Sequence, residues 1–211
     1  MTLRTVGVLD YGSGNLHSVC RALVTRGATV RLGRTGSELG RIDGLVLPGV
    51  GAFGACMRQL ESVGGDDLVR TQVAADRPLL AICVGHQVLF STGIEDAQTR
   101  AGLGVFPGQV TRLAARRLPH MGWNRLCVEG GPGILHRLEE QRFYFVHSYA
   151  AHRLDSNGNS SLPDGAAVAW AEHDGEEFVA AVQWRAITST QFHPEKSGAA
   201  GAGLLRNWLM G

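Results

Sequence analysis

One short stretch, residues 79–90, constrains the fold of this chain more than any other. It reads Leu-Leu-Ala-Ile-Cys-Val-Gly-His-Gln-Val-Leu-Phe. The apolar run 79–82 predicts a buried parallel strand, and residues 85–90 predict the start of a helix. Cys83 would then lie on the corner between them, where a tight turn with a glycine two residues later exposes the side chain above the sheet. The helix N-terminus at that corner would favour a thiolate and offer N–H groups to an oxyanion.

A cysteine nucleophile needs a base, and the base needs a group that orients it. The run 187–192 predicts a second buried strand, and His193, Pro194 and Glu195 follow it. Because side chains alternate along an extended segment, His193 and Glu195 can leave the same side, and Pro194 keeps His193 out of the helical region. The order predicts a Cys-His-Glu triad. The alternatives are that Cys83 is an ordinary buried cysteine and that His-Pro-Glu is a turn with a solvated histidine.

Together the two segments resemble those of the class I glutamine amidotransferases, whose elbow reads Gly-x-Cys-x-Gly-x-Gln and whose base reads His-Pro-Glu. Within that class, four further segments are similar to those of the glutaminase subunits of imidazole glycerol phosphate synthases, enzymes of histidine biosynthesis. These segments are residues 10–16, 47–53, 119–124 and 145–149. They occur in the expected order and span most of the chain, so the resemblance is specific.

The resemblance implies an oxyanion site beside the nucleophile. A glycine-rich loop follows the predicted strand 44–47, and in the family it can present a backbone N–H to the oxyanion; here it contains Gly49, Val50 and Gly51. Val84 N–H would be the second donor. The glycines would also allow the loop to rest with its N–H turned away. We therefore expect the isolated chain to be a poor glutaminase.

Three side chains would bind the L-glutamine substrate. These are Gln87, one turn into the helix, Glu95, at its end, and Ser148. Glu95 would meet the α-ammonium group, with a solvated surface carboxylate as the alternative.

The implied reaction is acyl transfer. Cys83 attacks the side-chain amide of glutamine, His193 protonates the departing ammonia, Glu195 orients the imidazole, and water hydrolyses the thioester. Ammonia would pass to a cyclase subunit with a (β/α)₈ barrel, which makes imidazole glycerol phosphate and an aminoimidazole carboxamide ribonucleotide. Since 211 residues are too few to hold a barrel as well, the cyclase must be another chain and the enzyme a heterodimer. Candidates for the interface are Asn15, Trp123, which could instead be a core residue, and Lys196.

Alternating strand and helix patterns through residue 90 predict an α/β fold of the flavodoxin-like amidotransferase kind, one domain over residues 1–211. Its central sheet would be mostly parallel and flanked by helices. An antiparallel sheet would be added at one edge by strands within 103–128, 143–148, 166–170 and 178–184. Residues 155–165 predict an exposed loop and residues 199–210 a closing helix.

Composition excludes several functions. The 20 Lys and Arg balance 19 Asp and Glu, so neither nucleic acid nor a membrane surface is an expected partner. Four scattered cysteines indicate a reducing cytoplasm, and the histidines have no metal-ligand spacing, so we expect neither a metal nor a cofactor. No segment is long and apolar enough to span a membrane.

Three positions depart from the family pattern, namely Ala81, His86 and Ala150. His86 is the most informative, because Gly-His-Gln is common in the sister amidotransferases for anthranilate and carbamoyl phosphate; we expect it to face the helix side, away from the thiol. Two rival classes stay open. One is a cysteine hydrolase or stress protein with a similar elbow but no downstream His-Pro-Glu, and the other is a non-catalytic binding subunit that kept the fold.

Overall fold

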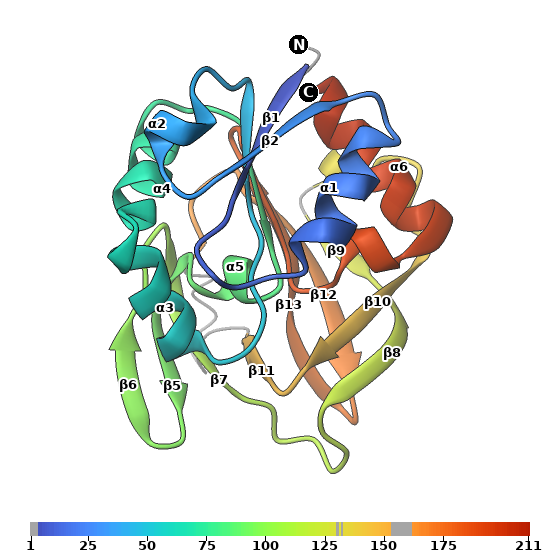
Figure 1. Cartoon of the computed structure of the whole chain (residues 1–211). Coiled ribbons are helices and arrows are strands. Elements are labelled where there is room, and N and C mark those ends of the chain that lie inside the picture. Colours follow the sequence, from blue (N-terminus) through green and yellow to red (C-terminus); the bar gives the residue numbers. More distant parts are fainter. Residues whose placement is uncertain (1–3, 130, 132, 153–161) are drawn as a thin grey trace.

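The computed structural model describes residues 4–129, 131, 133–152 and 162–211, and an eight-stranded sheet runs through this part of the chain (Figure 1). Five of its strands are parallel and lie in the order β2 (Thr29–Gly33), β1 (Thr5–Leu9), β3 (Gly44–Leu47), β4 (Leu79–Ile82) and β14 (Ile187–Thr190). Every residue of β3, β4 and β14 is buried, which explains why these strands are continuous apolar or small-polar runs.

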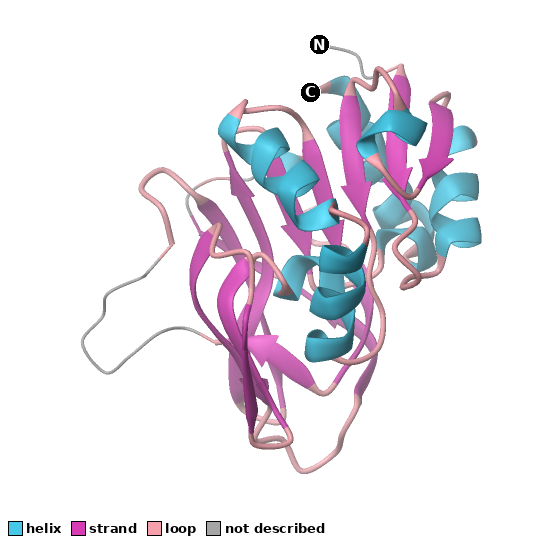
Figure 2. Cartoon of the chain, turned by 60° about the vertical axis from the view of Figure 1, so that its left-hand side comes forward, coloured by secondary structure: helices cyan, strands magenta, loops and turns pink. Residues whose placement is uncertain are grey.

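Helices cover both faces of the parallel strands (Figure 2). One face carries α1 (Leu16–Val24) and the closing helix α6 (Gly198–Met210), and the other carries α2 (Gly36–Leu39), α3 (Phe53–Ser62) and α4 (Gly65–Ala74). The predicted α/β architecture is confirmed. Ligands in such sheets bind beyond the carboxyl ends of the strands, which is where β3, β4 and β14 deliver the residues considered below.

The antiparallel part is more extensive than the sequence predicts. Strands β13 (Glu176–Trp184), β12 (Ala167–His173) and β9 (Cys127–Glu129) extend the main sheet beyond β14, as expected. A separate four-stranded sheet has the order β11 (Tyr149–Ala151), β7 (Phe106–Arg112), β5 (Phe90–Glu95) and β6 (Gln98–Ala101); its outer pairs are antiparallel but β5 and β7 run parallel, which the sequence did not predict. Strand β10 (Arg142–His147) pairs antiparallel with β8 (His120–Arg125). Two short 3₁₀ helices, η1 (Gly133–Leu135) and η2 (Pro194–Lys196), complete the described elements.

The predicted helix over residues 85–90 is wrong in extent. Helix α5 covers only Val84–Gln87, and the chain is already in strand β5 at Phe90. The physical reason is that the backbone carbonyls of Val88 and Leu89 form hydrogen bonds outside the helix. Val88 O accepts from Leu103 N at 2.7 Å, and Leu89 O accepts from Phe106 N at 2.9 Å. A longer helix would need these carbonyls for its own ladder.

Most of the predicted loop 155–165 lies outside the described residues, and its described part, residues 162–165, is irregular as expected. None of the helices in the described ranges has the length and hydropathy of a membrane span.

Candidate active site

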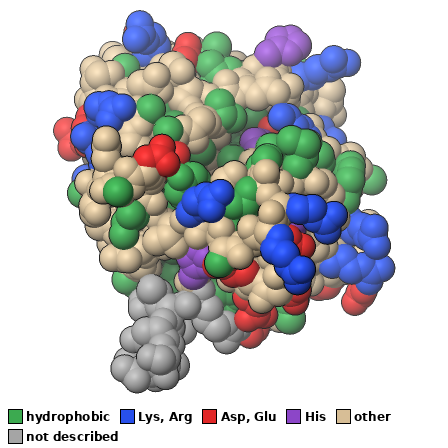
Figure 3. Space-filling model, turned by 90° about the horizontal axis from the view of Figure 1, so that it is seen from below, with side chains coloured by type: hydrophobic (Ala, Val, Ile, Leu, Met, Phe, Trp, Pro, Cys, Tyr) green, Lys and Arg blue, Asp and Glu red, His purple; other side chains and the backbone are tan. Residues whose placement is uncertain are grey.

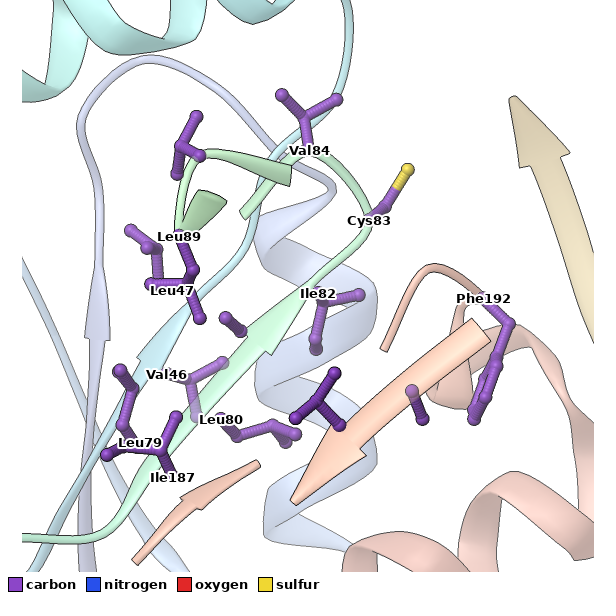
Figure 4. Close-up of a cluster of buried hydrophobic side chains, with 14 of the residues drawn as sticks. Val46, Leu47, Leu79, Leu80, Ile82, Cys83, Val84, Leu89, Ile187 and Phe192 are labelled. Carbon is purple, nitrogen blue, oxygen red and sulfur yellow. The ribbon is translucent and has the colours of Figure 1, made fainter. Parts of the chain in front are cut away.

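Cys83 occupies the corner between β4 and α5, as the elbow motif predicts. Its backbone has φ 56°, a left-handed value that is uncommon outside glycine, and its N–H donates to Thr190 O at 2.7 Å. Figure 4 shows the sulfur directed away from the apolar side chains of Leu80 and Ile82. Gly85 is required two residues later, because a Cβ there would lie 2.1 Å from Leu47 O. The corner therefore holds the thiol out of the core by backbone geometry.

The base reaches Cys83 because β14 is the neighbour of β4. Thr190 pairs with Ile82, so the residues that follow both strands meet at one edge of the sheet. His193 is extended, with φ −101° and ψ 96°, and its Nδ1 lies 2.8 Å from Glu195 Oε1. The structure corrects one detail, since Glu195 lies in η2 and not on an extended segment. The 3₁₀ turn that begins at Pro194 brings the carboxylate back to the imidazole.

The electrostatics of this pair suit a thiol nucleophile. Burial by itself lowers the pKa of His193, but the neighbouring Cys83 and Glu195 groups outweigh it and raise the pKa from 6.5 to about 10. Nδ1 is committed to Glu195, whereas Nε2 is buried and has no hydrogen-bond partner among the described residues. An imidazolium with an unoccupied N–H beside Cys83 stabilises a thiolate and can later protonate a leaving amine.

A pocket of about 220 Å³ opens over the thiol. Eight of its lining residues were predicted from the sequence as catalytic, oxyanion or substrate-binding: Val50, Gly51, Cys83, Val84, Gln87, Glu95, Ser148 and His193. Phe53, Val146, His147 and Tyr149 complete the walls together with Lys196, which was expected at a partner interface. The pocket thus combines an apolar wall with a few charged groups, as small-molecule sites generally do.

Two of the residues expected to bind glutamine have surroundings that the sequence did not indicate. Gln87 is buried, and its Nε2 donates to Tyr149 O at 2.8 Å and to Gln191 Oε1 at 3.0 Å. Glu95 does not end a helix; it ends strand β5, where it pairs with Gln98. Its carboxylate still faces the pocket because β5 runs along the pocket wall.

The glycine-rich loop packs directly on the elbow. A Cβ at Gly49 would lie 2.5 Å from Gly85 N, so only glycine permits this approach. In this arrangement two of the expected oxyanion donors are occupied: Val84 N donates to Gly49 O at 3.3 Å, and Val50 N donates to Ser13 Oγ at 3.0 Å. Neither N–H is therefore directed at the position of an oxyanion.

Ser13 and Cys56 fasten this loop conformation. The Ser13 hydroxyl donates to Val50 O at 2.7 Å, and Cys56 Sγ lies 3.2 Å from the same oxygen and 3.2 Å from Ser13 Oγ. We call these contacts of Ser13 and Cys56 with Val50 the loop latch. Tyr11 supports it from the side by donating its hydroxyl to Pro48 O at 2.6 Å. No spacing rule in the sequence indicates these contacts.

The three residues expected at a partner interface have different surroundings. Trp123 lies on β8 and is exposed, which removes the alternative of a core position. Lys196 is exposed at the rim of the pocket. Asn15 is half-buried and caps α1 by accepting from Ser18 N at 3.4 Å, so it has a local structural role.

His86 faces the core, as expected. It is fully buried, its Nδ1 lies 2.8 Å from Ser189 Oγ, and burial lowers its pKa from 6.5 to about 3. It is absent from the pocket walls and so does not compete with His193 as a base. Within the described ranges, no group of His, Cys, Asp and Glu side chains has the arrangement of a metal site.

Comparison with known proteins agrees with this geometry. The profile of the family glutamine amidotransferase class-I matches residues 7–211. A solved structure described as a glutamine amidotransferase superposes with a TM-score of 0.71 at 23% identity, covering 97% of this chain and 96% of that one. An elbow cysteine, a buried histidine–glutamate pair and this match place the chain in the class I glutamine amidotransferase family.

Particular relatives narrow the assignment. The chain is 50% identical to the imidazole glycerol phosphate synthase subunit HisH of Mycolicibacterium paratuberculosis, over 99% of this chain and 98% of the relative. It is 49% identical to the protein of the same name from Nocardia farcinica, over 99% of both chains.

Proposed function

We propose that this chain, acting as one domain over residues 1–211, is the glutaminase subunit of an imidazole glycerol phosphate synthase. It hydrolyses L-glutamine through a Cys83 thioester and delivers ammonia to a cyclase subunit in the cytoplasm. The observation that carries the proposal is that Cys83 and His193 line one pocket, while Glu195, buried behind the imidazole, accepts from Nδ1 of His193 and leaves Nε2 for the reaction.

The reaction follows from this geometry. The Cys83 thiolate attacks the amide carbon, and His193 gives its Nε2 proton to the departing ammonia. Glu195 keeps the proton of Nδ1 in place, so the tautomer suited to this transfer is maintained. Glu95, on the pocket wall, holds the α-ammonium group of the substrate. The same histidine then activates the water that hydrolyses the thioester.

The charge distribution also discriminates against the rival classes. The rival cysteine hydrolases lack the downstream His-Pro-Glu, whereas here that segment supplies a histidine whose Nδ1 lies 2.8 Å from Glu195 Oε1. A binding subunit without catalysis would have no need of a strained cysteine at φ 56°. Both features support glutaminase chemistry.

A partner surface lies beside the pocket. The face seen in Figure 3 is the one toward which β1 runs in Figure 1, and hydrophobic side chains there lie among Lys and Arg groups. Three large apolar side chains are exposed, Val50 at 42%, Met121 at 62% and Trp123 at 53%. Val50 lines the pocket, and Met121 and Trp123 lie on β8, where Met121 pairs with Val146 of the pocket wall. We assign this surface to the cyclase, with Trp123 as the anchor.

Because the loop latch holds the Val50 N–H away from the thiol, we expect the isolated chain to have low glutaminase activity. With both N–H donors occupied, an oxyanion formed at Cys83 lacks its stabilisation, and loss of one such donor slows a reaction by about a hundred- to a thousandfold. Contact of the cyclase with the exposed Val50 would change the loop conformation so that the Val50 N–H faces the oxyanion.

The test is substitution of the nucleophile in the complex with a cyclase. Cys83→Ala should abolish glutamine-dependent synthesis and leave ammonia-dependent synthesis intact, because only the source of ammonia uses the thiol. Cys127→Ala, which removes an exposed cysteine of β9, is the matched control and should retain both activities. Glutamine-dependent turnover near the unsubstituted rate in Cys83→Ala would refute the proposed function.

A further inference from the structure

A buried glutamine side chain, that of Gln191, contacts the Cys83 thiol. Gln191 follows β14 directly and is completely buried, and its side-chain Nε2 lies 3.8 Å from Cys83 Sγ. This distance is within reach of an N–H···S hydrogen bond, because sulfur is a large acceptor. The register of β14 on β4, with Thr190 opposite Ile82, places the two residues side by side.

The orientation of the Gln191 amide is determined by its neighbours. Gln87 Nε2 donates to Tyr149 O, and a backbone carbonyl can only accept, so the amide of Gln87 has one possible assignment. Its other N–H then donates to Gln191 Oε1 at 3.0 Å. The oxygen of Gln191 is thereby held on Gln87, and the NH₂ end must face the sulfur.

A donor at this position has a chemical purpose. Helix α5 has only the four residues Val84–Gln87, and the N–H of Val84 is bonded to Gly49 O, so the backbone provides less to the sulfur than a long helix would. A hydrogen bond donated to an ionised group favours the ionised form. A neutral amide also does this without adding a charge that would compete with His193.

We propose that Gln191 is a catalytic residue that donates a side-chain N–H to the Cys83 thiolate, and that Gln87 is the positioning residue that directs this donor. The inference rests on the proposed function only in that the thiolate is the nucleophile of glutamine hydrolysis. It gives Gln87 a role other than direct binding of the substrate.

The experiment measures alkylation of Cys83 by iodoacetamide in the full chain, followed on the Cys83 peptide by mass spectrometry, so that the other three cysteines do not interfere. Gln191→Met keeps the length of the side chain and removes the donor. Gln191→Glu keeps the acceptor for Gln87 and removes the donor. The midpoint of the alkylation–pH profile should rise by about one pH unit in Gln191→Met, and by at least as much in Gln191→Glu, where the added carboxylate also opposes the thiolate.

The pH profile of alkylation distinguishes a change in ionisation of the Cys83 thiol from a change in the access of iodoacetamide to it. On the alkaline plateau of each profile, where the thiolate is the reacting form, the alkylation rates of the variants should converge with that of the unsubstituted chain. Gln72→Met is the control for loss of a buried amide, because Gln72 is buried on α4 and bonds to Pro78 O; it should leave the profile unchanged. Gln87→Met should reproduce part of the Gln191 effect.

Three outcomes would overturn the assignment. They are an unchanged midpoint of the pH profile in both Gln191 variants, a rate reduced equally at every pH, and loss of folding in both variants, which would make the residue structural. Because alkylation requires neither glutamine nor a cyclase, a complex that failed to use glutamine would contradict the proposed function and leave this measurement standing.

Discussion

Releasing the loop latch should activate the isolated chain. Ser13→Ala removes two hydrogen bonds to Val50, one accepted from its N–H at 3.0 Å and one donated to its carbonyl at 2.7 Å. Each bond contributes about 1 kcal/mol net, so the resting conformation loses up to about 2 kcal/mol relative to the one that offers the N–H to an oxyanion. Cys56 still reaches Val50 O, and we therefore place the loss between about 1 and 2 kcal/mol.

This loss of stability in the resting conformation should raise the glutaminase rate of the isolated chain. A shift of about 1 to 2 kcal/mol raises a minor conformation about five- to thirtyfold, which stays below the hundred- to thousandfold ceiling set by one oxyanion donor. The assay is steady-state glutamate release by the isolated chain. We propose that the cyclase changes the loop conformation in the complex, so there the variant and the unsubstituted chain should have similar rates.

Ser62→Ala is the matched control. Ser62 is an exposed serine at the end of α3 whose hydroxyl donates to Gln59 O, so its loss leaves the loop untouched. A folded Ser13→Ala chain with unchanged basal activity would show that the latch does not hold the glutaminase silent.

Three further results are expected. His193→Ala should slow single-turnover acylation by at least about a hundredfold, since the imidazolium that stabilises the thiolate and protonates the departing ammonia is lost. Because the pKa of His193 is raised to about 10, acylation by the unsubstituted chain should decline only when His193 loses its proton in the alkaline range. Trp123→Ala should weaken assembly with the cyclase by about 2 kcal/mol or more, measured by calorimetry, if it is the anchor. Acidification from about pH 7 to 5 should lower the free energy of unfolding, measured by urea titration. Burial lowers the pKa of both His86 and His147 from 6.5 to about 3, so the unfolded chain takes up protons first and each histidine contributes up to about 1.4 kcal/mol per pH unit between these values.

Each of these has a decisive contrary result. Normal acylation in His193→Ala would show that a residue other than His193 activates the thiol and protonates ammonia. Unchanged assembly and activation in Trp123→Ala would remove that side chain from the interface. A urea midpoint that does not change between pH 7 and 5 would mean that the buried histidines are not neutral in the fold; in His147→Gln, which can still donate to Tyr149 O, the pH dependence should be shallower.

The parts of the site that could be predicted are those encoded by local pattern. The Cys83 elbow needs only an apolar run, a corner and Gly85, and the His193–Glu195 pair needs only a proline between them. The extent of α5 could not be predicted, because it is decided by Leu103 and Phe106, which take the carbonyls that a longer helix would use.

Contacts between distant side chains were also beyond the sequence. In the loop latch, Ser13 is separated by 37 positions from Val50 and by 43 positions from Cys56. Gln191 and Cys83 are separated by 108 positions. Such pairs obey no helical or strand period, so only the register of β14 on β4 and the return of the chain at Pro48 bring them together. Ser13 and Cys56 have no catalytic signature in the sequence.

The place of β14 in the sheet has a consequence for synthesis of the protein. Residues 187–190 insert between β4 and β13, in the middle of the eight strands, although they follow the other seven in the sequence and so are synthesised after them. Until then β4 presents an unpaired edge, and long-range pairing of this kind is slow and exposed to aggregation. The nucleophile is therefore made more than a hundred residues before its base, and a nascent chain cannot release ammonia. Glutaminase activity therefore depends on insertion of β14, and a truncation that removes β14 should reduce solubility as well as activity.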